Sequence, residues 1–177
     1  MLPIRENGDP VLHERAAPVA ASMFGTAELE TIIKDMEETL EAQADGVALA
    51  APQVGISYRI FIVRYDRMRE PDQASAIGGP EVGVFINPEF VKTSRKREEM
   101  QEGCLSVRGV YGTTIRHAQA TVRAQDARGT WFKRGGGGIL AQAFQHETDH
   151  LDGRLFIDHA EELHEQKSSD EHAVEPA

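Results

Sequence analysis

Apolar residues recur with helical spacing in the first half of the chain. The spacing i, i+3, i+4, i+7 and i+11, typical of one buried helical face, is carried by Leu29, Ile32, Ile33, Met36 and Leu40. Thr26 offers a hydroxyl that can cap the helix start, and Asp45-Gly46 is a stop signal. We therefore predict a helix from Thr26 to about Ala44.

Short apolar runs and breaker residues divide the rest of the chain. Buried strands are predicted at residues 59–63, 84–88 and 120–124. The segment 47–55 combines small side chains with a proline, which favours extended backbone over a helix. Residues 70–81 contain two prolines and two glycines and predict a surface loop. A second helix is predicted from about Ile139 to Leu151, and Gly153 ends it.

The order of these elements predicts the fold class. Strands and helices are mixed without a regular βαβ rhythm, so we expect an α+β fold with mixed or antiparallel strands around the second helix. The 177 residues suit one domain. Residues 160–177 hold six acidic residues and one lysine, with few large apolar side chains. We expect a folded domain at residues 1–159 and an acidic tail at residues 160–177, helical at most in part and otherwise disordered.

Composition excludes several classes of protein. Cys104 is the single cysteine, which excludes an internal disulfide and the zinc modules that need two or four thiolates. A net charge of −10 argues against direct nucleic-acid binding, and the apolar runs are too short to span a membrane. The N-terminus lacks the basic stretch and apolar core of a signal peptide. We therefore expect a protein of the reducing cytoplasm.

The second predicted helix carries an HExxH motif, His146-Glu147-Thr148-Asp149-His150. Residues four apart share a helical face, so both imidazoles can bind one metal ion. Glu147 can then reach a water molecule at that ion without being a ligand. Ile139 and Ala143 precede the histidines on the same face, which directs that face toward the core.

Two histidines leave a catalytic metal one protein ligand short. A metzincin would supply a third histidine downstream, but Phe156 stands at that position. A gluzincin would use a later glutamate, and those present lie in the polar tail. Cys104 remains as the upstream candidate, because a thiolate is a strong ligand for a borderline metal.

Three separate segments resemble the signature motifs of the peptide deformylase family. They are GVALAAPQ at 46–53, similar to the family's GxGLAAPQ, EGCLS at 102–106 and QHETDH at 145–150. The segments 8–12 and 151–158 are also similar to that family. The resemblance therefore extends over about residues 8–158, with the motifs in the family's order.

The resemblance implies a metal-dependent hydrolase that removes the formyl group from the N-terminal formyl-methionine of newly made proteins and releases formate. It implies one divalent ion per chain, ferrous iron in the cell, with zinc, nickel or cobalt able to replace it. The expected partners are N-formyl-methionyl nascent peptides, met by a monomer in transient association near the ribosome. No direct contact with nucleic acid or membrane is expected.

The resemblance also implies roles for individual residues. Glu147 would be the general base, while the Gln53 side chain and the Leu105 N–H would stabilise the oxygen that gains charge. An extended peptide would pair with the backbone of Val47 and Gly103. The residues expected to bind substrate are Val47, Ala48, Met100, Glu102, Gly103, Tyr111, Ile139, Gln142 and Ala143, with His146 beside them.

Three positions depart from the family pattern. Ala48 stands where glycine is usual, Arg108 where proline is frequent, and Tyr111 where some members have arginine. These departures keep open a related hydrolase with a different substrate or inhibitor sensitivity. A non-catalytic metal or peptide binder is a further alternative, against which the intact Glu147, Gln53 and Cys104 argue. A metalloprotease is another, against which Phe156 and the complete EGCLS motif argue.

Overall fold

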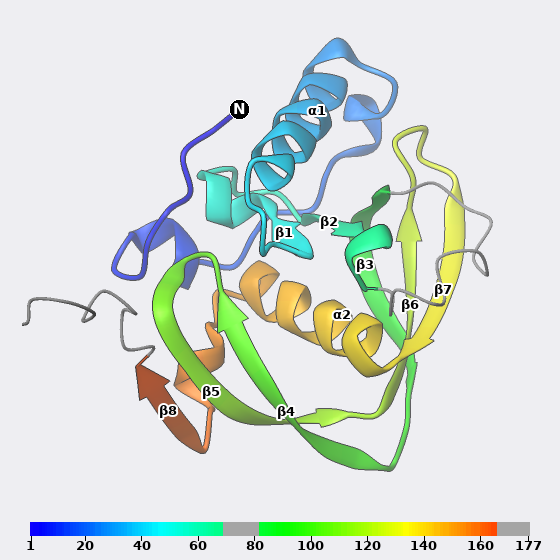
Figure 1. Ribbon diagram of the computed structural model, residues 1–177. Coiled ribbons are helices and arrows are strands. Elements are labelled where there is room, and N and C mark those ends of the chain that lie inside the picture. Colours follow the sequence, from blue (N-terminus) through cyan, green and yellow to red (C-terminus); the bar gives the residue numbers. More distant parts are fainter. Residues whose placement is uncertain (69–81, 166–177) are drawn as a thin grey trace, which may run out of the picture.

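Helix α2 (Gly138–Leu151) lies between two sheets in the computed structural model, which describes residues 1–68 and 82–165 (Figure 1). The larger sheet has the strand order β1-β2-β3-β6-β7, and the smaller has the order β4-β5-β8. Neighbouring strands within both sheets are antiparallel. The expected α+β fold, with strands around the second helix, is confirmed.

The elements follow one another along the chain without a repeat. The strands are β1 (Ala48–Ala50), β2 (Ile60–Arg64), β3 (Val82–Thr93), β4 (Arg97–Cys104), β5 (Val107–His117), β6 (Gln119–Gln125), β7 (Trp131–Gly137) and β8 (Glu162–Glu165). The other helix is α1 (Ala27–Glu41), and short 3-10 turns occupy Pro10–His13, Ala21–Met23, Ala51–Val54, Asp66–Met68 and Phe156–Asp158. No helix in the described part of the chain is long and apolar enough to cross a membrane.

The first four residues of strand β2, 60–63, are all apolar because both faces of the strand are covered there. Ile60 and Ile62 pack with the side chains of α1, whereas Phe61 and Val63 pack with α2. A strand that is buried on both faces has no solvent-exposed face, so apolar and polar residues do not alternate along it. The larger sheet is thus held between the two helices, and α2 is fixed against it (Figure 1).

Helix α1 begins as predicted and ends three residues early. The Thr26 hydroxyl accepts a hydrogen bond from the Leu29 N–H at 3.3 Å, which satisfies one free donor of the first turn. The predicted apolar face is buried except for Ile32, which is half-buried. The last helical residue is Glu41, and a turn connects it to β1.

The segment 47–55 is only partly extended. Residues 48–50 form β1 and pair with β2, but residues 51–54 turn into a single 3-10 coil. Gln53 stabilises that coil, because its Oε1 accepts a hydrogen bond from the Ala50 N–H at 2.9 Å. Gly55 closes it with φ of 81°, a conformation that favours glycine.

The expectation of a helical stub at the start of the acidic tail is wrong. Residues 162–165 form β8, which pairs with β5 in the register Val110↔Glu165 to Thr113↔Glu162. The N–H and C=O groups along β5 offer this segment backbone partners, which a strand can use regardless of its polar side chains. The rest of that tail, and the whole of the predicted loop at 70–81, lie outside the described residues.

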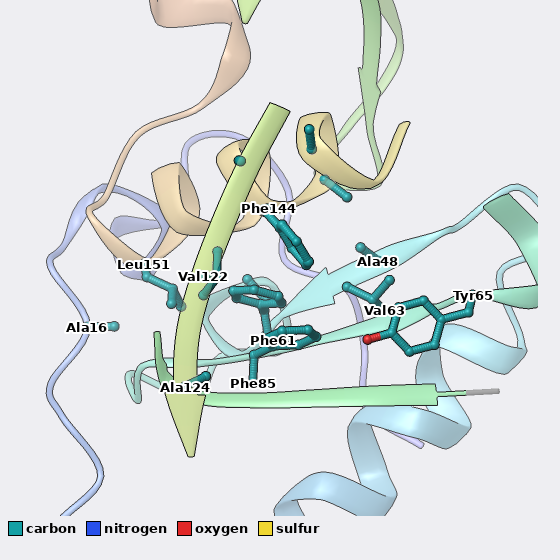
Figure 2. Close-up of a cluster of buried hydrophobic side chains, with 14 residues drawn as sticks. Ala16, Ala48, Phe61, Val63, Tyr65, Phe85, Val122, Ala124, Phe144 and Leu151 are labelled. Atoms are coloured by element: carbon teal, nitrogen blue, oxygen red, sulfur yellow. The ribbon is translucent and has the colours of Figure 1, made fainter. Parts of the chain in front are cut away.

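An aromatic cluster joins α2 to the larger sheet. Phe61 and Phe85 stack with their ring centroids 4.7 Å apart, and the Phe144 ring meets Phe85 edge-on at 5.2 Å. Figure 2 shows Phe144 pointing from α2 toward these two rings. All three side chains are fully buried. Since α2 also carries the HExxH motif, this cluster sets the position of the histidines.

We expect Phe61→Ala to lower the free energy of unfolding by about 3–5 kcal/mol, the usual cost of removing a buried ring. Chemical denaturation followed by circular dichroism measures the change. Phe90→Ala is the matched control, because Phe90 is 41% exposed. An equal loss in both variants would contradict the importance of the cluster.

Candidate active site

Three potential metal ligands converge where α2 meets the end of β4. His146 and His150 lie one turn apart on α2, and Cys104 is the last residue of β4. Their ligand atoms all lie within 4.8 Å of one another, and Cys104 Sγ is 3.3 Å from His150 Nε2. The structure thus brings together the three residues that the sequence predicts.

The electrostatics of this group suit a metal ion. Burial alone would raise the pKa of the Cys104 thiol, but the imidazoles of His150 and His146 hold that pKa well below its usual value. A thiolate is the form in which cysteine binds metal. One thiolate with two imidazoles is a donor set for zinc, iron, nickel or cobalt and not for calcium or magnesium. The residues present therefore fit one divalent transition-metal ion.

A buried network orients His146. Its Nδ1 lies 3.0 Å from Glu102 Oε2, and both carboxylate oxygens of Glu102 also accept hydrogen bonds from the Arg116 guanidinium, at 2.6 and 2.9 Å. Thr114 donates to the same carboxylate, and Arg116 reaches Asp149 of α2 at 2.6 Å. Burial would raise the pKa of Glu102, but Arg116 and His146 hold it well below its ordinary value. The second imidazole nitrogen, Nε2, is left to face Cys104 and His150.

Glu147 provides a buried carboxylate beside the three ligands. Within residues 1–68 and 82–165 its Oε2 has no hydrogen-bond partner. Burial raises the pKa of Glu147 to about 7, although the two histidines act in the opposite direction. A carboxylate with such a pKa can both accept and return a proton near neutral pH.

Gln53 and Leu105 are neighbours of Cys104. Gln53 Nε2 is 3.5 Å from Cys104 Sγ and donates to Ser106 Oγ at 3.2 Å. Its amide orientation is fixed, because Oε1 is already bonded to the Ala50 N–H. Leu105 occupies the turn that links β4 to β5, directly after Cys104. Both residues line the same pocket as the metal-ligand group.

That pocket has a volume of about 460 Å³ and is open to solvent. Of the residues expected to bind substrate, it is lined by Val47, Ala48, Glu102, Gly103, Tyr111, Ile139, Gln142 and Ala143, together with His146. Met100 lies outside it, opposite Thr114 in the β4–β5 pair. Ile139 is 47% exposed, so it forms part of the pocket wall and not of the core.

Several residues of the site were not predicted from the sequence. Asp45, Gly46, Gln101, Val107, Gly109 and Val110 line the pocket, and so does Arg108, one of the three departures from the family pattern. Thr114 and Arg116 donate hydrogen bonds to Glu102, and Asp149 accepts one from Arg116. The only signal for Arg116 was its place in a stretch of alternating polar residues, which gives no indication of an ion pair across two strands.

Comparison with known proteins agrees with this arrangement. The profile of the polypeptide deformylase family matches residues 1–166. A peptide deformylase of Dehalococcoides mccartyi (strain CBDB1) is 43% identical over 171 residues, covering 95% of this chain and 93% of that protein.

Solved structures give the same result. The actinonin-bound class I type b peptide deformylase of Acinetobacter baumannii superposes with a TM-score of 0.80 at 32% identity, over 90% of this chain and 98% of that one. Its Met-Ala-Ser-bound form superposes with a TM-score of 0.79 at 33% identity, with the same coverage. The chain that places Cys104, His146 and His150 around one point, with Glu147 beside them, belongs to the polypeptide deformylase family of enzymes.

Proposed function

We propose that this enzyme hydrolyses the N-formyl group from the N-terminal formyl-methionine of newly made proteins and releases formate. The observation that carries the proposal is the buried Glu147 carboxylate, whose Oε2 has no hydrogen-bond partner among the described residues, next to a cysteine–histidine–histidine group in an open pocket. Cys104, His146 and His150 would hold one divalent ion. We propose ferrous iron as the ion in the cell, with zinc, nickel or cobalt able to occupy the same ligands.

The side chains divide the chemistry between them. A bound divalent ion supplies Lewis acidity, which lowers the pKa of water and polarises a carbonyl oxygen. Glu147 takes a proton from the attacking water as the new C–O bond forms at the formyl carbon. The Gln53 amide and the Leu105 N–H donate to the formyl oxygen as it gains charge. Glu147 then returns the proton to the amine as the C–N bond breaks, which leaves formate and a free N-terminus.

The peptide would lie in extended form between two backbone segments, Val47–Ala48 and Gly103. The Met-Ala-Ser tripeptide bound to the Acinetobacter baumannii relative supports a peptide of this length and sequence as the ligand. We propose that the enzyme works as a cytoplasmic monomer on nascent chains near the ribosome. The net charge of −10 is consistent with a protein that meets the peptide and not the RNA.

Two of the departures from the family pattern, Tyr111 and Ala48, lie beside the backbone segments between which we propose that the peptide binds. The Tyr111 ring covers Gly103: a Cβ added to Gly103 would be only 2.8 Å from Tyr111 Cε1. Ala48 places a methyl group in the opposite wall of the pocket. These two contacts favour a second candidate function, deformylation with an altered preference for substrate or inhibitor, which parallel assays on formyl-methionyl peptides and other formamides would separate from the first.

Glu147→Gln is expected to reduce formate release from formyl-Met-Ala-Ser by about 10³-fold or more, since it removes the proton acceptor. Metal content, measured by elemental analysis after anaerobic purification, should stay at the wild-type level because Glu147 is not a ligand. Glu161→Gln, at an exposed position, is the control. Substantial turnover in Glu147→Gln would overturn the assignment of the base.

Cys104→Ala is expected to lose tight metal binding, because the chain has no second thiol to replace it. Elemental analysis after dialysis against a chelator measures the loss. Ser106→Ala serves as the comparison, since it alters a neighbour of Gln53 without removing a ligand. Full metal retention in Cys104→Ala would exclude the thiolate from the ligand set.

Ala48→Gly is expected to change the affinity for formyl-methionyl peptides or hydroxamates more than the affinity for metal. Ala48 is 7% exposed and lines the pocket, and it is not one of the three candidate metal ligands. Steady-state KM and hydroxamate inhibition measure the affinity for peptide and inhibitor, and metal titration measures the affinity for the ion. Unchanged kinetics and inhibition would show that Ala48 is neutral.

A further inference from the structure

The turn between α1 and β1 forms one wall of the peptide pocket. Residues 45–47 of the turn line that pocket, and so does Ala48, the first residue of β1. The turn has little regular structure of its own: the Gln43 N–H bonds to Leu40 O at 3.1 Å, and the Gly46 N–H to Gln43 O at 3.2 Å. Other parts of the chain must therefore fix its position.

The Arg67 side chain binds the backbone of this turn through hydrogen bonds. Its Nη1 donates to three backbone carbonyls, Leu40 O at 3.0 Å, Gln43 O at 2.6 Å and Gly46 O at 2.8 Å. Its Nη2 donates to Glu41 O at 3.2 Å, and the same nitrogen lies 3.3 Å from the Glu41 carboxylate. The last carbonyls of a helix have no partner within the helix, and a cation is favourable at that end. One guanidinium thus binds the end of α1 and both ends of the turn.

Residues of the β4–β5 connection contact the same turn from the side of the pocket. Leu105 Cδ1 approaches Gly46 so closely that an added Cβ would be 3.2 Å from it, and Leu40 Cδ1 would be at 2.9 Å. Arg108 Nη2 donates to Gln43 Oε1 at 2.8 Å. The turn therefore lies between Arg67 and the β4–β5 connection, so its position determines the distance between the Val47–Ala48 backbone and Gly103.

We propose that Arg67 is a positioning residue for the peptide substrate, acting through the turn at residues 42–47. Its side chain is 19% exposed and contacts the carbonyls of the turn, while it does not line the pocket itself. By holding these carbonyls it keeps the Val47–Ala48 edge at the spacing at which an extended peptide can bond to both walls. The proposal rests on the proposed function, because it concerns the binding of that same peptide.

Arg67→Met keeps the aliphatic bulk of the side chain and removes the donors. We expect KM for formyl-Met-Ala-Ser to rise about three- to tenfold, the effect of weakening about one backbone hydrogen bond to the peptide. The kcat should stay within about twofold, because the metal ligands and Glu147 are unchanged. Amide hydrogen exchange of residues 42–48 should become faster, and Arg67→Lys should give intermediate values of both quantities.

Arg123→Met is the matched control. It also removes an arginine with an ion pair (Glu89, 2.7 Å) and a contact with an aromatic ring (Trp131, 4.4 Å), but on β6, away from the pocket. A KM in Arg67→Met equal to that of Arg123→Met would overturn the proposal, even if the melting temperature fell. Unchanged exchange at residues 42–48 would overturn it as well.

The two proposals can fail separately. If the wild-type enzyme releases no formate, the proposed function fails, and calorimetric binding of Met-Ala-Ser then replaces KM as the measure for Arg67. Weaker binding in Arg67→Met than in Arg123→Met, with faster exchange in the turn, would still support the positioning role. Equal binding in the two variants would exclude it.

Discussion

The buried ion pair between Glu102 and Arg116 is the interaction on which the site depends. It joins β4 to β5, and through Asp149 and His146 it joins both strands to α2. Two opposite charges taken out of water are costly unless each finds several partners, and removal of one partner typically destabilises a protein by about 3–5 kcal/mol. Here every oxygen of Glu102 is bonded. The Glu102 carboxylate that connects the smaller sheet to α2 also orients the His146 ring. The contacts that stabilise the fold therefore also position this ligand.

This arrangement explains why the ligands can come from distant parts of the chain. α2 alone places two imidazoles at the correct spacing, since one helical turn separates them. Cys104 comes from the other sheet, and its position depends on how β4 lies against α2. The aromatic cluster around Phe61 fixes α2 from one side, and the Glu102–Arg116 pair fixes β4 from the other. Contacts between side chains on both sides of the site thus help to position the three ligands.

The parts of the structure that were predictable from the sequence are those with local signals. The face of α1, the capping Thr26 and the HExxH spacing all lie within a few turns of one helix, and Cys104 followed from the missing third ligand. Strands β4 and β5 were not predicted, because their exposed faces alternate charged and small residues with few apolar ones. The role of Arg116 depends on a pairing between strands and a helix, 14 and 33 residues apart, which no local pattern contains.

Strand β8 has a consequence for association. A sheet edge exposes unpaired backbone groups that can bind another chain, and short, charged edge strands reduce this hazard. The segment Glu162–Glu165 pairs with residues 110–113 of β5, so that this part of the sheet ends in a four-residue strand with a glutamate at each end. The opposite edge of that sheet, β4, faces the pocket. The fold therefore covers part of the edge at which a second copy could pair, and among the described strands it leaves the β4 edge free on the side of the pocket.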